Sequence, residues 1–178
     1  MTDPAVAQVF RYTLSLDCKA AGIRATGSEA LLEVRYLGSN GEVLAEPRIS
    51  LPRSPDRPRD GRTWTGRISD ELCRSSTDFA KALLFYSDAE VKYVQIETNG
   101  DDALWIDRAL LQQDFGSEPR WRPRSTHTWG KDGGNGYCLS TRRTDYLGAW
   151  EPYVGNGRKC RTCFEFNLDE QKVANECR

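Results

Sequence analysis

The sequence predicts a mainly β protein: an antiparallel two-layer β-sandwich with one short helix and a long irregular C-terminal extension. Runs of alternating apolar and polar residues recur over the first two thirds of the chain, and this alternation is typical of strands with one buried face. Asn-Gly dipeptides punctuate the runs, and because both residues tolerate positive φ, they are strong hairpin signals. There are four, at Asn40-Gly41, Asn99-Gly100, Asn135-Gly136 and Asn156-Gly157.

The first strands follow directly from the alternation. A strand is expected over 10–16, where every second residue from Phe10 is apolar. A second strand over 31–37 leads into the Asn40-Gly41 turn, and the chain returns through Val43 and Leu44. The sequence therefore predicts a hairpin near its N-terminus.

The middle of the chain adds further elements. A short strand is expected over 62–68, and the spacing of Phe79, Leu83 and Leu84 predicts the one helix, Asp78 to Phe85. Strands follow over 91–98 and 104–111. The second is apolar on both faces, as in a central strand, and Trp105 is its expected core residue.

Two segments show no periodicity. Residues 52–62 carry three prolines and no apolar anchor, and 116–136 is rich in Gly, Pro, Ser, Thr and Arg, so both are expected to be loops. Alternation returns briefly at 137–139 and 162–166, before a short polar tail.

Length and charge limit the organisation and the partners. The 178 residues suit one domain with an appendage: a sandwich over 1–115, and a loop-rich, cysteine-containing extension over 116–178 that packs on or completes it. The formal charge of −1 gives no general attraction to nucleic acid, so nucleic acid is an unlikely partner. No apolar run could span a bilayer, and any targeting peptide is expected to be absent from this chain.

Residues from about 10 to 112 resemble the PLAT/LH2 β-sandwich domain. Gly27-Ser28-Glu29-Ala30 at the start of a strand, which ends in the Asn40-Gly41 hairpin, is similar to the family's Gly-Thr-Asp-Ala motif. The strands from Val91 to Leu111 resemble the family's strand pair in which a tryptophan, here Trp105, follows an acidic turn. The resemblance implies a non-catalytic sandwich of about eight strands that contacts lipid or a partner protein. Ser28-Glu29 departs from the family's Thr-Asp, which argues against an inherited calcium site.

Six cysteines, an even number, favour a disulfide framework, with reduced thiols and a metal site as the alternatives. We predict at least one disulfide among the four in the C-terminal third, and pairing would favour an oxidising compartment or organelle lumen. Cys160 and Cys163 form a CxxC, but the sequence offers no second such pair for zinc and no following helix for a redox couple. The six are Cys18, Cys73, Cys138, Cys160, Cys163 and Cys177.

The most unusual local chemistry is a segment in which arginines alternate with tryptophans. Such side chains bind phosphates and bases, sit at membrane interfaces, form protein contacts, or pack internally through cation–π contacts. We favour protein contact, with a membrane or lipid surface second. The predicted binding residues are Arg120, Trp121, Arg122, Arg124, Trp129 and Lys131.

Metal and catalytic signatures are sparse. Calcium is a possible but unsupported ligand, because the acidic residues near turns lack EF-hand spacing: Glu29, Asp101, Asp102, Asp107 and Asp114. His127 is the single histidine, with no recognisable nucleophile turn beside it, and the glycines at 133–136 lack a phosphate-loop continuation. The sequence therefore predicts a non-catalytic protein that needs no cofactor.

The leading hypothesis is a binding module that docks onto a protein, at a membrane in one version, through the arginine and tryptophan segment. One alternative is an accessory structural subunit of a large assembly, including a membrane-associated one. The other is a carbohydrate-binding sandwich that stacks sugars on Trp129, Tyr137, Tyr146, Trp150 or Tyr153.

Overall fold

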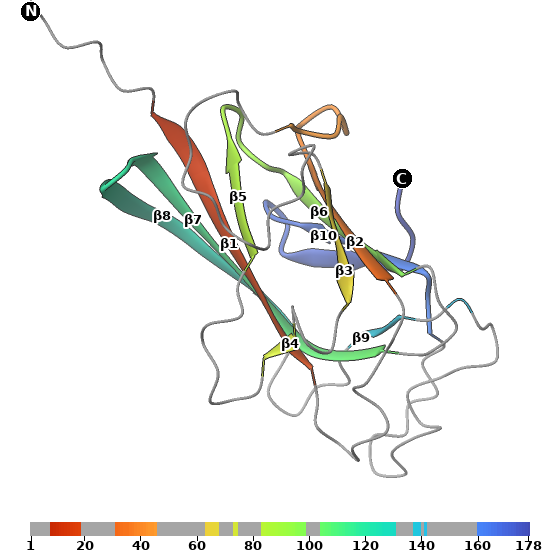
Figure 1. The fold of residues 1–178 in the computed structure, drawn as a ribbon. Helices are drawn as coiled ribbons and strands as arrows, with labels where there is room; N and C mark the ends of the chain where they lie inside the picture. Colours follow the sequence, from red (N-terminus) through yellow and green to blue (C-terminus); the bar gives the residue numbers. More distant parts are fainter. Residues whose placement is uncertain are drawn as a thin grey trace, which may run out of the picture.

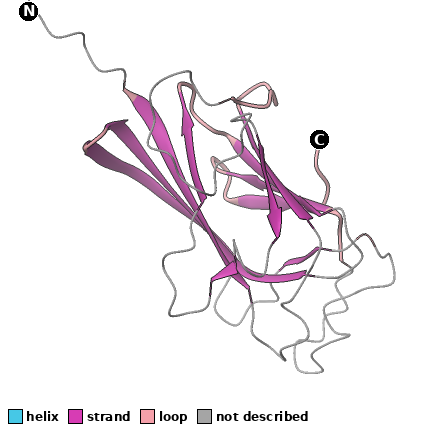
Figure 2. Ribbon diagram, in the orientation of Figure 1, coloured by secondary structure: helices cyan, strands magenta, loops and turns pink. Residues whose placement is uncertain are grey.

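The fold is given by a computed structural model, which describes residues 8–18, 31–45, 63–67, 73–74, 83–98, 104–130, 137–139, 141 and 160–178. Every regular element in these ranges is a strand, and none is a helix. The strands form two sheets that face each other (Figures 1 and 2). The predicted mainly β, two-layer architecture is therefore confirmed.

The first sheet has six strands around a long central pair, β1 and β7. Its order is β4-β1-β7-β8, with β5 also paired to β1 and β9 also paired to β7. All of these pairings are antiparallel except that of β1 with β4. The strands are β1 (Val9–Cys18), β4 (Cys73–Arg74), β5 (Leu83–Ser87), β7 (Leu104–Ser117), β8 (Arg120–Trp129) and β9 (Tyr137–Leu139).

The second sheet has five strands, all antiparallel, in the order β11-β10-β6-β2-β3. Strands from near both ends of the chain therefore share this sheet, because β6 lies between β2 and β10. The strands are β2 (Leu31–Leu37), β3 (Thr63–Arg67), β6 (Tyr93–Thr98), β10 (Cys163–Asn167) and β11 (Lys172–Ala174).

The core lies between the sheets and is built from alternate residues of facing strands. Aromatic rings connect the two layers: Tyr36 of β2 stacks on Phe85 of β5 with ring centroids 4.1 Å apart, and Trp129 of β8 lies 5.0 Å from Phe166 of β10. The alternation that predicted the strands is confirmed by the buried residues, among them Tyr12, Leu14, Leu16, Val34, Val94, Ile96, Ile106 and Leu111. Trp105 lies in β7 opposite Cys138, but its side chain is outside the described part, so its burial stays a prediction.

The predicted turn at Asn40-Gly41 is confirmed. The Gly38 N–H donates to the Glu42 carbonyl at 2.9 Å, and Gly41 has a φ of 77°, which glycine adopts without strain. The return is shorter than expected, because it consists of a single bridge between Leu37 and Val43. The other three Asn-Gly pairs lie outside the described residues.

The helix expected over Asp78–Phe85 is wrong where the structure describes it, because Leu83, Leu84 and Phe85 belong to β5. Phe85 is the cross-strand partner of Tyr12, so its ring reaches the core from an extended backbone. Three consecutive apolar residues fit a buried strand as well as one helical face, and pairing with β1 decides between them. Residues 78–82 lie outside the described part.

The loop expected over 116–136 is also wrong for most of its length. Strand β7 continues to Ser117, and β8 returns from Arg120 to Trp129, paired with β7 along its whole length. The register shifts at Gln113 and Asp114, where Arg124 is the extra residue of a β-bulge. The bulge and Pro123 interrupt the alternation of β8, which conceals the strand in the sequence.

Two disulfides fix the C-terminal third, as predicted. Cys138 of β9 is bonded to Cys160, and Cys163 of β10 is bonded to Cys177. Both are consistent with an oxidising environment. Cys18 and Cys73 lie in the paired strands β1 and β4, and their side chains are outside the described part. Within the described ranges, no helix has the length and apolarity needed to cross a membrane.

Candidate binding surface

The predicted arginine and tryptophan segment is the second strand of a long hairpin. The tips of β7 and β8, residues 114–124, extend beyond the strands of the second sheet, so among the described strands they have no partner layer (Figure 1). We call these residues the hairpin arm. Its inner face carries Phe10 and Phe115 and continues the side of the first sheet that faces the core, and its outer face, which carries Trp121, is the opposite side. The two faces carry different side chains.

The outer face of the hairpin arm holds Trp121 in internal contacts. Its indole N–H donates to the Glu118 carboxylate at 2.8 Å, its ring lies 5.8 Å from Tyr86, and the Arg11 guanidinium lies 4.5 Å from the ring centroid. The position opposite Trp121 is Gly116, where a Cβ would collide with the Arg120 carbonyl oxygen. Trp121 is therefore half-buried and packed within the protein.

Arg11 itself is paired. Its Nη2 donates to Asp114 Oδ2 at 2.8 Å and its Nε at 3.2 Å, and both side chains are largely covered. The cation that lies over Trp121 is therefore neutralised by a neighbour on β7. This is the internal cation–π arrangement that the sequence left open as one of several interpretations.

The inner face of the hairpin arm carries unpaired cations beside two aromatic rings. Phe10 and Phe115 are half-buried, with ring centroids 4.9 Å apart, and the Arg124 guanidinium lies 5.5 Å from the Phe10 ring centroid and 6.0 Å from that of Phe115. Arg120, Arg122 and Arg124 are exposed, and among the described residues no carboxylate pairs with any of them. The arm is thus locally basic.

Trp129 does not belong to this surface, and the expectation that it contacts a partner is corrected. It lies at the opposite end of β8, is 2% exposed, and packs against Phe166 and His127. Every second residue from Ser125 to Trp129 faces the core, so the indole closes the sandwich. Lys131 lies outside the described residues.

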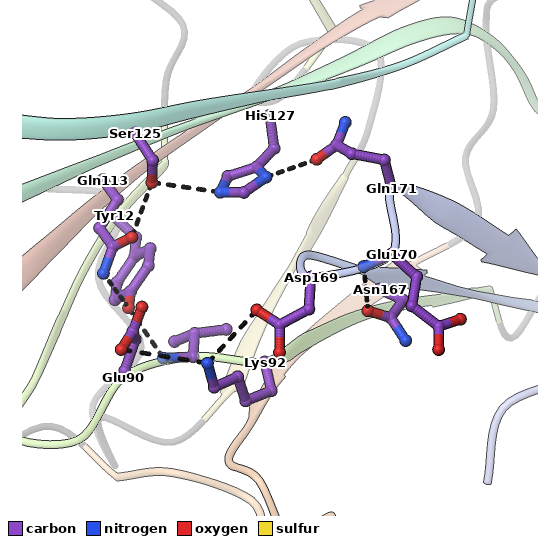
Figure 3. A network of polar contacts seen from close by, with 11 residues as sticks. Tyr12, Glu90, Lys92, Gln113, Ser125, His127, Asn167, Asp169, Glu170 and Gln171 are labelled. Atoms are coloured by element: carbon purple, nitrogen blue, oxygen red, sulfur yellow. Dashed lines mark hydrogen bonds and ion pairs between the residues drawn. The ribbon is translucent and has the colours of Figure 1, made fainter.

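A chain of polar side chains lines the inner face next to the hairpin arm (Figure 3). His127 contacts Gln171 through Nδ1 and Ser125 through Nε2, the latter at 3.1 Å. Ser125 Oγ lies 2.7 Å from Gln113 Oε1, and Gln113 Nε2 lies 3.1 Å from the Tyr12 hydroxyl. The sequence alone does not predict this chain, although Ser125, His127 and Trp129 have the spacing of one strand face.

Ion pairs join the β5–β6 connection to the β10–β11 turn beside this chain. Lys92 Nζ lies 3.3 Å from Asp169 Oδ1 in the β10–β11 turn, and 4.0 Å from Glu90 Oε2. These are partly exposed contacts of modest energy. They link the β5–β6 connection to the turn that carries Gln171 (Figure 3).

The described residues contain no group of three side chains able to hold a metal ion. Asp114 is engaged by Arg11, Asp107 is described only as backbone, and Glu29, Asp101 and Asp102 lie outside the described part. Cys160 and Cys163 of the CxxC are each bonded to a different cysteine. Neither the zinc nor the redox interpretation is therefore compatible with this pairing.

Ser125 and His127 are within hydrogen-bond distance, as in a nucleophile and base pair. Ser125 Oγ, however, is also held by Gln113, so both of its contacts lie inside the protein.

No protein-family model, curated protein or solved structure matches this chain. The resemblance to PLAT/LH2 domains accordingly stays a prediction, and the function has to be argued from the surface itself.

Proposed function

We propose that the protein is a non-catalytic binding module that docks onto an acidic protein surface through the inner face of the hairpin arm. The single observation that carries this proposal is the set of three exposed arginines without carboxylate partners among the described residues. They lie on an arm that extends beyond the second sheet (Figure 1). Within the described part of the chain, the three arginine side chains are therefore accessible to a large partner.

The chemistry of the arm favours carboxylates. A guanidinium group forms paired, charge-assisted hydrogen bonds with a carboxylate, and these are about twice as strong as bonds between neutral groups. Phe10 and Phe115 add half-buried apolar area between the cations, which is typical of the centre of a protein interface. The overall charge of −1 means that the attraction is local to the arm.

The proposal includes an oxidising compartment or organelle lumen, which the two disulfides support. An anionic membrane surface is the rival partner, because lipid phosphates also attract arginine. The carbohydrate alternative is weakened by the buried Trp129 and by Tyr137, whose ring packs edge-on against Phe164 and Phe166. Tyr146, Trp150 and Tyr153 lie outside the described residues.

The test compares two variants that each lose two cations. One is Arg120→Gln/Arg122→Gln on the hairpin arm, and the matched control is Arg161→Gln/Lys172→Gln, two exposed cations away from it. Binding is measured by fluorescence anisotropy with a labelled polyglutamate peptide, and by sedimentation with phosphatidylserine vesicles. We expect polyglutamate binding to weaken about tenfold in the arm variant only, since two charge-assisted hydrogen bonds are lost.

Equal weakening by both variants would show that only net charge matters and would contradict the proposal. Binding to the vesicles but not to polyglutamate would replace the protein partner with a membrane.

A further inference from the structure

The polar chain beside the hairpin arm has fixed hydrogen-bonding requirements at both ends. It runs from Gln171 through His127, Ser125 and Gln113 to the hydroxyl of Tyr12, which accepts the Val91 backbone N–H at 2.8 Å (Figure 3). It therefore connects an exposed turn of the second sheet to the buried Val91 of the β5–β6 connection.

At the outer end, the contacts fix the proton on Nδ1 of His127. Gln171 Nε2 donates to the Thr128 carbonyl at 3.2 Å, so its amide oxygen is the atom that faces His127. An oxygen accepts only, so Nδ1 must carry the hydrogen. In neutral imidazole Nε2 is then the acceptor, and Ser125 must donate its hydroxyl hydrogen to it.

At the inner end, the hydrogen of the Tyr12 hydroxyl needs an acceptor in the neutral arrangement. Burial raises the pKa of Tyr12 far above its ordinary value, so the hydroxyl keeps its hydrogen. Its oxygen already accepts from Val91, and among the described residues its other hydrogen-bond partner is Gln113. In the structure, Gln113 turns its Nε2 to Tyr12 and its Oε1 to Ser125. An acceptor for the Tyr12 hydrogen requires the other orientation, in which the Gln113 oxygen faces Tyr12 and the Gln113 nitrogen donates to Ser125.

With neutral His127, each contact of the chain joins a donor to an acceptor when the hydrogen bonds run from Tyr12 through Gln113 and Ser125 to His127. A half-turn of the Gln113 carboxamide exchanges its oxygen and nitrogen without moving any other heavy atom. This half-turn separates the neutral arrangement from a second one, in which the three bonds that connect Tyr12, Gln113, Ser125 and His127 run the opposite way; the structure has Gln113 in this second orientation.

A second proton on His127 requires that second arrangement. Nε2 then donates to Ser125, Ser125 donates to the Gln113 oxygen, and the Gln113 nitrogen donates to Tyr12. The Tyr12 oxygen now accepts two N–H groups, and its own hydrogen has lost Gln113 as an acceptor. The Tyr12–Val91 bond at the buried end is weakened as a consequence.

We propose that His127 is a pH switch: uptake of one proton at Nε2 reverses the hydrogen-bond chain, turns the Gln113 carboxamide and loosens Val91 from Tyr12. The charged groups around the chain come from three elements. Asp169 and Glu170 belong to the β10–β11 turn, and Glu90 and Lys92 to the β5–β6 connection (Figure 3). Arg124 of β8 acts on Tyr12 through its charge. The switch does not depend on the proposed docking function.

His127 is the single histidine, so its ring nitrogens give unambiguous NMR signals in the 15N-labelled full chain. We expect the neutral ring to carry its proton on Nδ1. On acidification, the Gln113 side-chain amide and the Val91 backbone amide should shift with the same midpoint as the ring. In Ser125→Ala the ring should still titrate while Gln113 and Val91 stay constant.

The matched control is Thr126→Ala, which removes a hydroxyl from the other face of β8 and should titrate like the wild type. A neutral ring protonated on Nε2 would overturn the proposal. So would Gln113 and Val91 signals in the wild-type protein that do not change while His127 titrates, and this outcome needs no variant to fold.

Discussion

The hairpin arm and the C-terminus both place an arginine over an aromatic ring, but with opposite results. At the C-terminus, the Arg178 guanidinium lies 3.8 Å from the Tyr93 ring centroid and donates two hydrogen bonds to Glu165, at 2.9 and 3.0 Å. The neighbouring Cys177 is bonded to Cys163 of the same strand as Glu165. The guanidinium group of Arg178 therefore holds the C-terminal residue against strands β6 and β10 of the second sheet.

On the hairpin arm, Arg124 lies over Phe10 and Phe115, but no described carboxylate completes the arrangement. The comparison teaches that an arginine beside an aromatic ring does not by itself define a binding surface. The presence of a carboxylate and a nearby covalent link gives a structural contact, and their absence leaves the cation available to a partner.

The largest expected effect is at the point where β8 leaves the hairpin arm and enters the core. Trp129→Ala should destabilise the protein by about 3–5 kcal/mol, because it empties a buried site between the two sheets. Trp121→Ala should cost much less, since that indole is only half-buried. Urea denaturation measures both, and equal losses would contradict the assignment of one tryptophan to the core and one to the surface.

Removing the C-terminal link should have the next largest effect. Cys163→Ser/Cys177→Ser should cost about 3 kcal/mol, because the bond closes a loop with a sequence separation of 14. Denaturant midpoints under non-reducing conditions measure the loss.

Thiol titration of the denatured, unreduced wild type should find at most two free thiols among the six cysteines; four or more would contradict the two pairings.

The Glu165–Arg178 contact should make stability depend on pH. Burial alone would raise the pKa of Glu165, but hydrogen bonds from Arg178 and Gln95 outweigh it and hold the pKa below its ordinary value. A lowered pKa stabilises the fold above the unfolded-state value of about 4.3, and this contribution is lost as the pH falls through the folded-state value.

Wild type should therefore have a higher Tm than Glu165→Gln at pH 7, and the difference should shrink on acidification below about pH 5. Glu170→Gln, at an exposed carboxylate, is the control and should show no such trend. A difference in Tm between wild type and Glu165→Gln that does not change with pH would mean that the pKa of Glu165 is not lowered.

The smallest effect on stability is expected for the arm cations. Arg120→Gln/Arg122→Gln should leave the free energy of unfolding within about 0.5 kcal/mol of wild type, since both side chains are exposed and unpaired within the described structure. A clearly larger loss, measured by the same urea denaturation, would show that they serve the fold.

The sequence was sufficient to predict much of the sandwich, because burial on one face imposes alternation on β1, β2 and β6. The prediction from the sequence was wrong where burial on one face imposes little alternation, or where the residue pattern fits two kinds of structure. Phe85 follows two leucines, so its segment fits a helix until pairing with Tyr12 is known. Strand β8 extends past the second sheet, so nothing forces its outer residues to alternate.

The candidate binding surface on the hairpin arm was predicted only in part from the sequence. Composition locates the arginines, but it does not show that Trp129 faces Phe166 or that Trp121 is held by Arg11 and Glu118. The contact between Tyr12 and Gln113 joins residues 101 positions apart, and no local pattern reports it. Such long-range contacts are set by the register of the strands.

The most direct test of the central claim is residue-resolved arginine modification with phenylglyoxal, followed by mass spectrometry, with and without polyglutamate. Arg120 and Arg122 should react quickly and be protected by polyglutamate, whereas Arg11, Arg35 and Arg178, which are ion-paired, should react slowly and not respond to it. Rapid modification of the ion-paired arginines, or no protection of Arg120 and Arg122, would contradict the account.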